Sequence, residues 1–88
     1  MLKTFRILPL FFLLCFSAFA IDRAPVESSN IKTVGWESGI LEIEFHSGGI
    51  YQYSDVPASV YTDMLNAPSK GKYFHANVKG RYEFRRIK

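Results

Sequence analysis

The sequence predicts a small α+β domain, in which an antiparallel sheet carries two short helices on one face. Three observations support this fold class. Residues 40–46 alternate apolar and polar side chains, as a half-buried strand does. The pair Gly48-Gly49 follows this strand and predicts a hairpin. Residues 56–65 repeat apolar side chains at helical spacing, so the expected order of elements is βββααβ.

The first predicted strand covers residues 31–37, which are rich in β-branched side chains. Regular alternation places Val34 and Trp36 on one face of this strand and Ile31 on the other. We therefore expect Ile31 to point away from the side chains that Val34 packs against.

The second predicted strand, residues 40–46, is joined to the third by a three-residue loop at residues 47–49. A glycine in this loop supplies the left-handed backbone conformation that such hairpins need. The loop length places Phe45 opposite Tyr51, which keeps the apolar faces of the two strands together.

Two helices and a last strand complete the predicted domain. The first helix starts at residues 55–57, with Pro57 in its first turn, where a missing N–H group costs nothing. Ser69 caps the second helix, and Gly80 follows its end. Residues 81–87 alternate again and predict a strand that returns to the sheet.

The chain has the length of one domain. Residues 21–29 are polar and predict a mobile N-terminal tail with no part in the core, so the folded domain is expected at residues 30–88. A domain of this size has a small core, and its aromatic side chains are the expected source of stability. These are Trp36, Phe45, Tyr51, Tyr53, Tyr61, Tyr73, Phe74, Tyr82 and Phe84.

The first 20 residues have the three parts of a secretory signal peptide. Lys3 and Arg6 form its positive end, residues 7–16 its apolar run, and residues 18–20 a small-x-small cleavage site. We therefore expect cleavage after Ala20 and a mature protein in the periplasm or outside the cell. After cleavage no stable membrane span is expected.

Two alternatives exist for this N-terminal segment. It is a retained membrane anchor in the first, although the apolar run is shorter than the ~20 residues that a membrane-spanning helix needs. In the second, Cys15 carries a lipid, although Leu14 stands where a lipoprotein signal has a small residue. Cleavage after Ala20 removes Cys15, the single cysteine, and with it any disulfide.

Basic residues are concentrated in the last part of the chain. Residues 69–88 contain seven lysine and arginine residues and one acidic residue, whereas residues 21–68 contain two basic and seven acidic residues. The basic segment either neutralises the acidic strands within the fold or meets an anionic partner. The expected partner is an anionic polymer, nucleic acid or glycan, or else an acidic protein surface.

The strongest local binding pattern lies at the start of the second helix, in residues 68–74. A serine cap, two lysines and a glycine there combine unpaired N–H groups with the positive end of a helix dipole, which favours an anion. In the alternative interpretation, the serine only caps the helix and the lysines are solvated. The predicted anion-binding residues are Ser69, Lys70, Gly71, Lys72, Lys79, Arg81, Arg85 and Arg86.

Aromatic residues lie between these basic residues in the last part of the chain, a combination that single-stranded nucleic-acid binding proteins use. Most of the rings are needed for the core, so we expect one or two at most to contact a ligand. A second hypothesis is a protein-interaction or structural module that acts through a sheet edge or an exposed aromatic patch.

Signatures of catalysis are missing from the sequence: it has no nucleophile elbow, phosphate-binding loop or paired metal ligands. We predict a non-enzymatic protein that is monomeric, with no catalytic residue, no metal and no cofactor. Glu44, His46 and His75 form the one combination that approaches a zinc ligand set.

Taken together, these motifs resemble the KTSC domain, a small module named for its occurrence at the C-terminus of some lysyl-tRNA synthetases. The resemblance covers nearly all of the chain after residue 28. The family has no settled function, and the synthetase context of the resemblance suggests a role in binding nucleic acid. The matching segments are residues 28–31, 41–45, 48–53, 56–57, 67–74 and 77–79, together with Tyr82.

Overall fold

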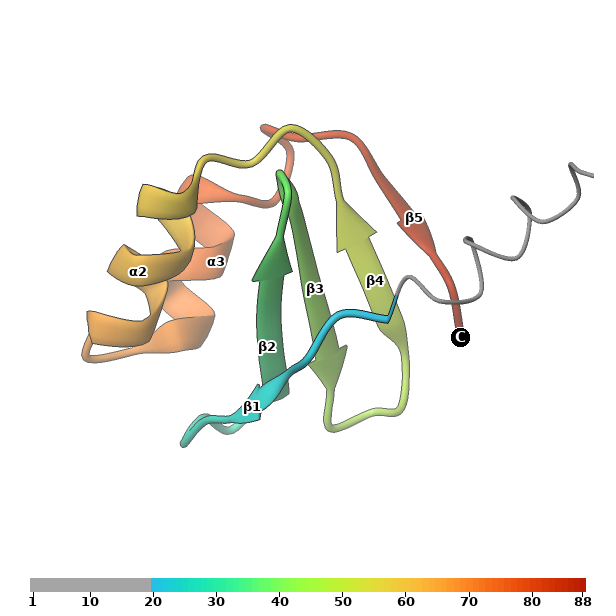
Figure 1. Ribbon diagram of the computed structural model, residues 1–88. Coiled ribbons are helices and arrows are strands. Elements are labelled where there is room, and N and C mark those ends of the chain that lie inside the picture. Colours follow the sequence, from blue (N-terminus) through green and yellow to red (C-terminus); the bar gives the residue numbers. More distant parts are fainter. Residues whose placement is uncertain (1–19) are drawn as a thin grey trace, which may run out of the picture.

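The computed structural model describes residues 20–88, so the predicted signal peptide lies outside the described residues, except for Ala20. A five-stranded antiparallel sheet with the strand order β1-β2-β3-β4-β5 forms one layer, and two helices form the other (Figure 1). This confirms the predicted α+β class, with one short strand added at the start. The elements are β1 Ala24–Pro25, β2 Ile31–Glu37, β3 Ile40–Phe45, β4 Ile50–Tyr53, α2 Ala58–Asn66, α3 Lys70–Asn77 and β5 Phe84–Arg86.

The segment of residues 21–29 belongs to the fold, so the expectation that it takes no part in the core is wrong. Strand β1 pairs with β2, the side chain of Ile21 is buried, and Val26 packs against the core. Gly35 in β2 permits this arrangement, because a Cβ atom at that position would collide with the carbonyl oxygen of Asp22. The sequence alone does not show which distant segment packs closely against a given glycine.

A β-bulge in β2 places Ile31 on the other face of the sheet than the sequence predicts, so the expected facing of Ile31 is wrong. The register between β2 and β3 shifts between Ile31 and Thr33. A bulge adds one residue to one strand, which reverses the alternation on either side of it. Ile31 and Val34 therefore share the core face, and both are fully buried.

The hairpin between β3 and β4 has a three-residue loop, but the loop lies one residue earlier than predicted. The N–H group of Phe45 donates to the carbonyl oxygen of Gly49 over 2.9 Å, which leaves residues 46–48 as the loop. Gly48 takes a φ of 110° and supplies the conformation that the turn requires.

This displacement of the loop by one residue shifts the strand register by two residues. Ile43 lies opposite Tyr51, where Phe45 was expected. A shift of two preserves the face on which each side chain lies. Phe45 and Tyr51 remain diagonal neighbours, with ring centroids 5.7 Å apart in an edge-to-face arrangement.

Both predicted helices form, and their ends are set by local hydrogen bonds. Pro57 is the residue before α2 instead of a member of its first turn. Ser69 caps α3 as expected, its hydroxyl oxygen accepting from the N–H group of Lys72 over 3.2 Å. Gly80 takes a φ of 81° just after α3. Within residues 20–88, no helix has the length and apolar character needed to cross a membrane.

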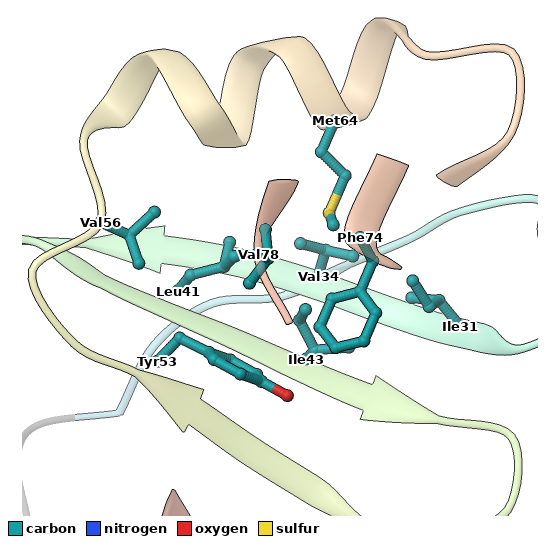
Figure 2. Close-up of a cluster of buried hydrophobic side chains, with 9 residues drawn as sticks. All are labelled: Ile31, Val34, Leu41, Ile43, Tyr53, Val56, Met64, Phe74 and Val78. Carbon is teal, nitrogen blue, oxygen red and sulfur yellow. The ribbon is translucent and has the colours of Figure 1, made fainter. Parts of the chain in front are cut away.

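The core lies between the sheet and the helices (Figure 2). Met64 of α2 and Phe74 of α3 point toward the sheet, and Val78 follows from the end of α3. Burial of these apolar surfaces is the main force that holds the two layers together. The buried cluster consists of Ile31, Val34, Leu41, Ile43, Tyr53, Val56, Met64, Phe74 and Val78.

The opposite face of the sheet carries a charged network beside the N-terminal segment. The carboxylate of Glu42 is buried and accepts from Arg23 Nη1 over 2.7 Å and from Gln52 Nε2 over 2.8 Å. Glu44 accepts from the hydroxyl of Thr33 over 3.0 Å. The acidic side chains of β3 therefore find their hydrogen-bonding partners in the part of the chain before α2.

Candidate ligand-binding groove

A groove lies between α3 and the side of the sheet formed by β4 and β5. Figure 1 shows both helices on the β2 side, with β5 farthest from them. The helical layer therefore leaves part of the sheet face uncovered. The groove has a volume of about 640 Å³, which lies in the usual range of small-molecule sites, roughly 300–1,000 Å³.

Five aromatic side chains line this groove. They come from β3, β4, α3 and β5, so no single element forms the surface. Neighbouring rings have centroids 5.5 to 5.8 Å apart and meet at steep or tilted angles, as aromatic pairs prefer. We name this set the aromatic cluster; its members are Phe45, Tyr51, Tyr53, Phe74 and Phe84.

The members of the aromatic cluster differ in exposure. Tyr53 is 5% exposed and Phe74 6%, so both belong to the core as well as to the groove. Phe84 is 60% exposed, although it contacts the rings of Tyr51 and Tyr53. The groove thus has a buried base and an exposed outer side.

Polar and basic groups border the aromatic cluster. Asn30 and His46 line the groove beside the sheet, and His75 and Lys79 line it beside α3. The ring of His46 is held by a hydrogen bond from Nε2 to the carbonyl oxygen of Ser28, 3.0 Å away. Cations and hydrogen-bonding groups therefore lie close to aromatic faces.

Arg86 adds a second cation on the β5 side. Its register position opposite Tyr51 places it on the groove face of the sheet. The guanidinium carbon is 5.8 Å from the centroid of the Tyr51 ring, within cation–π range.

The predicted anion-binding residues at the start of α3 lie apart from most of the aromatic cluster. Ser69, Lys70 and Lys72 border a second depression, together with residues 27–30. Part of their hydrogen-bonding capacity is used locally, because Lys70 Nζ donates to the carbonyl oxygen of Ala67 over 2.9 Å. Gly71 lines both this depression and the groove.

The predicted basic residues beyond α3 are divided among different surfaces. Lys79 lines the groove. Arg81 donates to the carbonyl oxygen of Ala76 over 3.2 Å and borders a further depression that shares Gly80 and Phe84 with the groove. Arg85 lies opposite Gln52 in the sheet, so it belongs to the face that carries the Glu42 network. Gly71 and Lys79 therefore line the groove, Arg86 contacts the Tyr51 ring, and Arg81 lies beside the outer side of the aromatic cluster.

The zinc ligand set considered from sequence is not assembled. His46 and His75 both line the groove, but Glu44 lies on the opposite face of the sheet and bonds to Thr33. Over residues 20–88, no group of three or more His, Cys, Asp and Glu side chains is placed to hold a metal ion.

Sequence reasoning did not identify the aromatic cluster as a site, because it assigned nearly all of the rings to the core. A signal was available in the alternation of Phe45, Tyr51, Tyr53 and Phe84 on the core face of three predicted strands. Two short helices cannot cover four rings and the aliphatic core together, so some of the rings remain at the surface.

Three comparisons relate this chain to known proteins. The model of the KTSC domain family matches residues 27–82. The lysine–tRNA ligase of Nostoc punctiforme is 44% identical over 63 residues, which are 69% of this chain and 11% of the ligase. The chain thus spans about one tenth of the length of that relative. An uncharacterised protein of Stutzerimonas stutzeri is 38% identical over 70 residues, 76% of this chain and 99% of that protein.

A solved structure shows the same fold. The crystal structure of a KTSC domain protein from Yersinia pestis has a TM-score of 0.75 to this chain at 38% sequence identity. The likeness covers 78% of this chain and 100% of that chain. The residues that line the groove fall within the KTSC match at residues 27–82, except Phe84.

Proposed function

The chain belongs to the KTSC domain family, and from this premise we propose that it is a non-enzymatic module that binds single-stranded nucleic acid. The observation that carries the proposal is the groove, which the aromatic cluster lines together with Lys79, and Arg86 lies beside the Tyr51 ring. Bases stack on exposed aromatic rings, at about 1–3 kcal/mol per base, and cations beside the rings contact the phosphates.

The distribution of ion pairs supports an external partner for the basic segment. Within residues 20–88, the ion pairs join Arg23 and Lys32 to Glu42 and Glu44. No lysine or arginine of the described residues 69–88 pairs with an acidic side chain, although Arg86 Nε donates to the carbonyl oxygen of Lys88 over 2.8 Å. The alternative in which this segment neutralises the acidic strands therefore finds no support in the contacts.

The relatives make RNA the first polymer to test. The matching segment occurs in lysine–tRNA ligases, whose name states tRNA as a substrate of the whole enzyme. This chain matches about one tenth of such an enzyme, so the ligase reaction is not assigned to it. Single-stranded DNA and a sulfated glycan are the matched alternative ligands, since they carry similar charge with other bases or none.

We also propose that the protein is exported, with a mature chain that begins at Ile21. The charged, apolar and small-residue parts of residues 1–20 support this location. The test is the intact mass of the protein recovered from the periplasmic and culture fractions. A mass that begins at Ile21 is expected, and a full-length protein retained in the cytoplasm or the membrane would contradict export.

Binding is tested by the fluorescence anisotropy of labelled single-stranded RNA, DNA and a sulfated glycan across a salt series. We expect RNA to bind with an affinity that falls steeply with salt, because phosphate contacts release counterions. Lys79→Ala and Arg86→Ala should each weaken binding and flatten the salt dependence. Lys32→Ala is the matched control, since Lys32 pairs with Glu44 on the other face of the sheet.

Two results would count against this function. Affinity for RNA that does not change with salt would exclude the phosphate contacts. Loss of binding in a variant with Lys70→Glu and Lys72→Glu, with Lys79→Ala unaffected, would move the site to the start of α3.

An exposed apolar edge favours a second candidate function, protein interaction. Phe84 and Ile87 are 60% and 43% exposed, and both lie on or next to β5, the last strand of the sheet. An edge strand with exposed apolar side chains can pair with another chain. Sedimentation at two concentrations would show self-association that persists in high salt, whereas the proposed nucleic-acid module stays monomeric.

A further inference from the structure

Tyr53 combines burial with a hydroxyl group that has no hydrogen-bond partner among residues 20–88. The side chain is 5% exposed, and its hydroxyl forms no hydrogen bond with another residue of the described chain, 20–88. Buried polar groups in folded proteins are nearly always paired. Trp36 follows that rule, since its indole N–H donates to the carbonyl oxygen of Val56 over 2.7 Å. Because Tyr53 also lines the groove, its hydroxyl is available to a group that enters there.

The ring of Tyr53 is held in place from two sides. Its centroid lies 5.5 Å from that of Phe74 and 5.6 Å from that of Phe84. Figure 2 shows the ring along the sheet, with the hydroxyl oxygen on the side away from Val56. A donor fixed in this way loses little conformational entropy when a ligand arrives.

The hydroxyl keeps its proton across the physiological range. Burial, with a smaller contribution from the neighbouring Tyr51, raises the pKa of Tyr53 to about 12. A neutral phenol can donate one hydrogen bond. A ligand that fits this position offers a hydrogen-bond acceptor on a planar ring system, because a planar ring packs well beside aromatic side chains.

We propose that Tyr53 donates a hydrogen bond to an acceptor atom on the edge of a nucleobase that enters the groove beside Phe74 and Phe84. This rests on the proposed nucleic-acid function and deepens it, because it makes Tyr53 a residue that contacts the base itself. Uracil offers carbonyl oxygens to this donor, and adenine offers ring nitrogens. The groove therefore favours single strands that carry bases over a strand with the same phosphates and no bases.

The test compares three labelled RNA strands of about twelve nucleotides, near the site size of other single-strand binders. They are oligo(U), oligo(A) and a strand with the same phosphates but abasic sugars. Each is titrated against the purified protein and against Tyr53→Phe, which removes only the hydroxyl. Tyr61→Phe is the matched control, since Tyr61 lies on α2 and does not line the groove.

The unmodified protein should bind oligo(U) and oligo(A) more tightly than the abasic strand. Tyr53→Phe should bind oligo(U) about three- to tenfold more weakly, the effect of one neutral hydrogen bond, with abasic binding unchanged. Its thermal midpoint should equal or exceed that of the unmodified protein, because no internal hydrogen bond is lost. A purely structural role for the hydroxyl would lower the midpoint instead.

The outcomes separate the two proposals. If Tyr53→Phe binds oligo(U) as tightly as the unmodified protein does, base recognition by Tyr53 is wrong and the groove function stands. If the unmodified protein binds none of the three strands, both proposals are wrong. If the thermal midpoint of Tyr53→Phe falls clearly while that of Tyr61→Phe does not, the hydroxyl is structural and the inference is overturned.

Discussion

The ring of Phe74 on α3 meets the ring of Tyr53 on β4 edge to face, with 5.5 Å between their centroids. This contact joins the helical layer to the fourth strand. Both side chains belong to the buried core and also line the groove. The stability of the fold and the proposed binding site therefore share this pair of side chains.

Phe74→Leu should lower the free energy of unfolding by about 1–3 kcal/mol, because it loses the edge-to-face contacts and leaves unfilled volume. Urea unfolding followed by Trp36 fluorescence measures this change. Phe84→Leu is the control, since Phe84 is 60% exposed and should cost less than about 1 kcal/mol. Equal losses in the two variants would mean that Phe74 does not join the layers.

Gly35→Ala should destabilise the fold by about 1–3 kcal/mol, because the added methyl group collides with the carbonyl oxygen of Asp22. The N-terminal segment should then detach, which hydrogen exchange at residues 21–26 would detect. Gly71→Ala is the comparison: its Cβ meets only Asn30 Nδ2, at 3.4 Å, and alanine favours a helix. Unchanged exchange at residues 21–26 in Gly35→Ala would contradict the observed packing of this segment.

Glu42→Gln should cost about 1–3 kcal/mol of stability, because Arg23 and Gln52 lose a charged acceptor at a buried position. Glu37→Gln, at the exposed end of β2, should change little. Thermal unfolding of both variants in the same buffer provides the comparison. A loss no larger than that of the control would show that the Glu42 network does not contribute.

Stability should fall at alkaline pH through Tyr53. Its pKa is raised to about 12 in the folded protein from the ordinary value of 10.0, so the unfolded chain releases this proton first. The stabilisation is complete below pH 10 and is lost as the pH rises toward 12. Urea midpoints measured on either side of pH 10 should show a smaller loss for Tyr53→Phe. The same loss in both proteins would contradict this linkage.

The sheet and helices were largely predictable, because alternation and capping are local properties of the chain. The alternating apolar residues Leu41 and Ile43 predict a strand, and Ser69 predicts the start of a helix. The bulge after Ile31, the crossing at Gly35 and the hairpin register were not predictable. They depend on which distant segment packs against a residue or on which N–H group closes a loop.

The candidate site was predictable only in part for the same reason. The run of basic residues after Ser69 is visible in the sequence. Strand alternation, however, places Arg85 on one face of the sheet and Arg86 on the other. The aromatic cluster forms only when β5 pairs with β4. Part of it stays exposed because α3 does not cover these two strands. Its members therefore resemble ordinary core residues until the topology is known.

The most direct test of nucleic-acid binding in the groove is a titration of the isotopically labelled protein with single-stranded RNA, followed by two-dimensional NMR of its amide groups. We predict that the largest shift changes occur at groove residues, among them Tyr53, Phe74 and Lys79, with little change at Glu42 and Gln52 on the opposite face. Changes centred on Ser69 and Lys72, changes on the Glu42 face, or no change at all would contradict nucleic-acid binding in the aromatic groove.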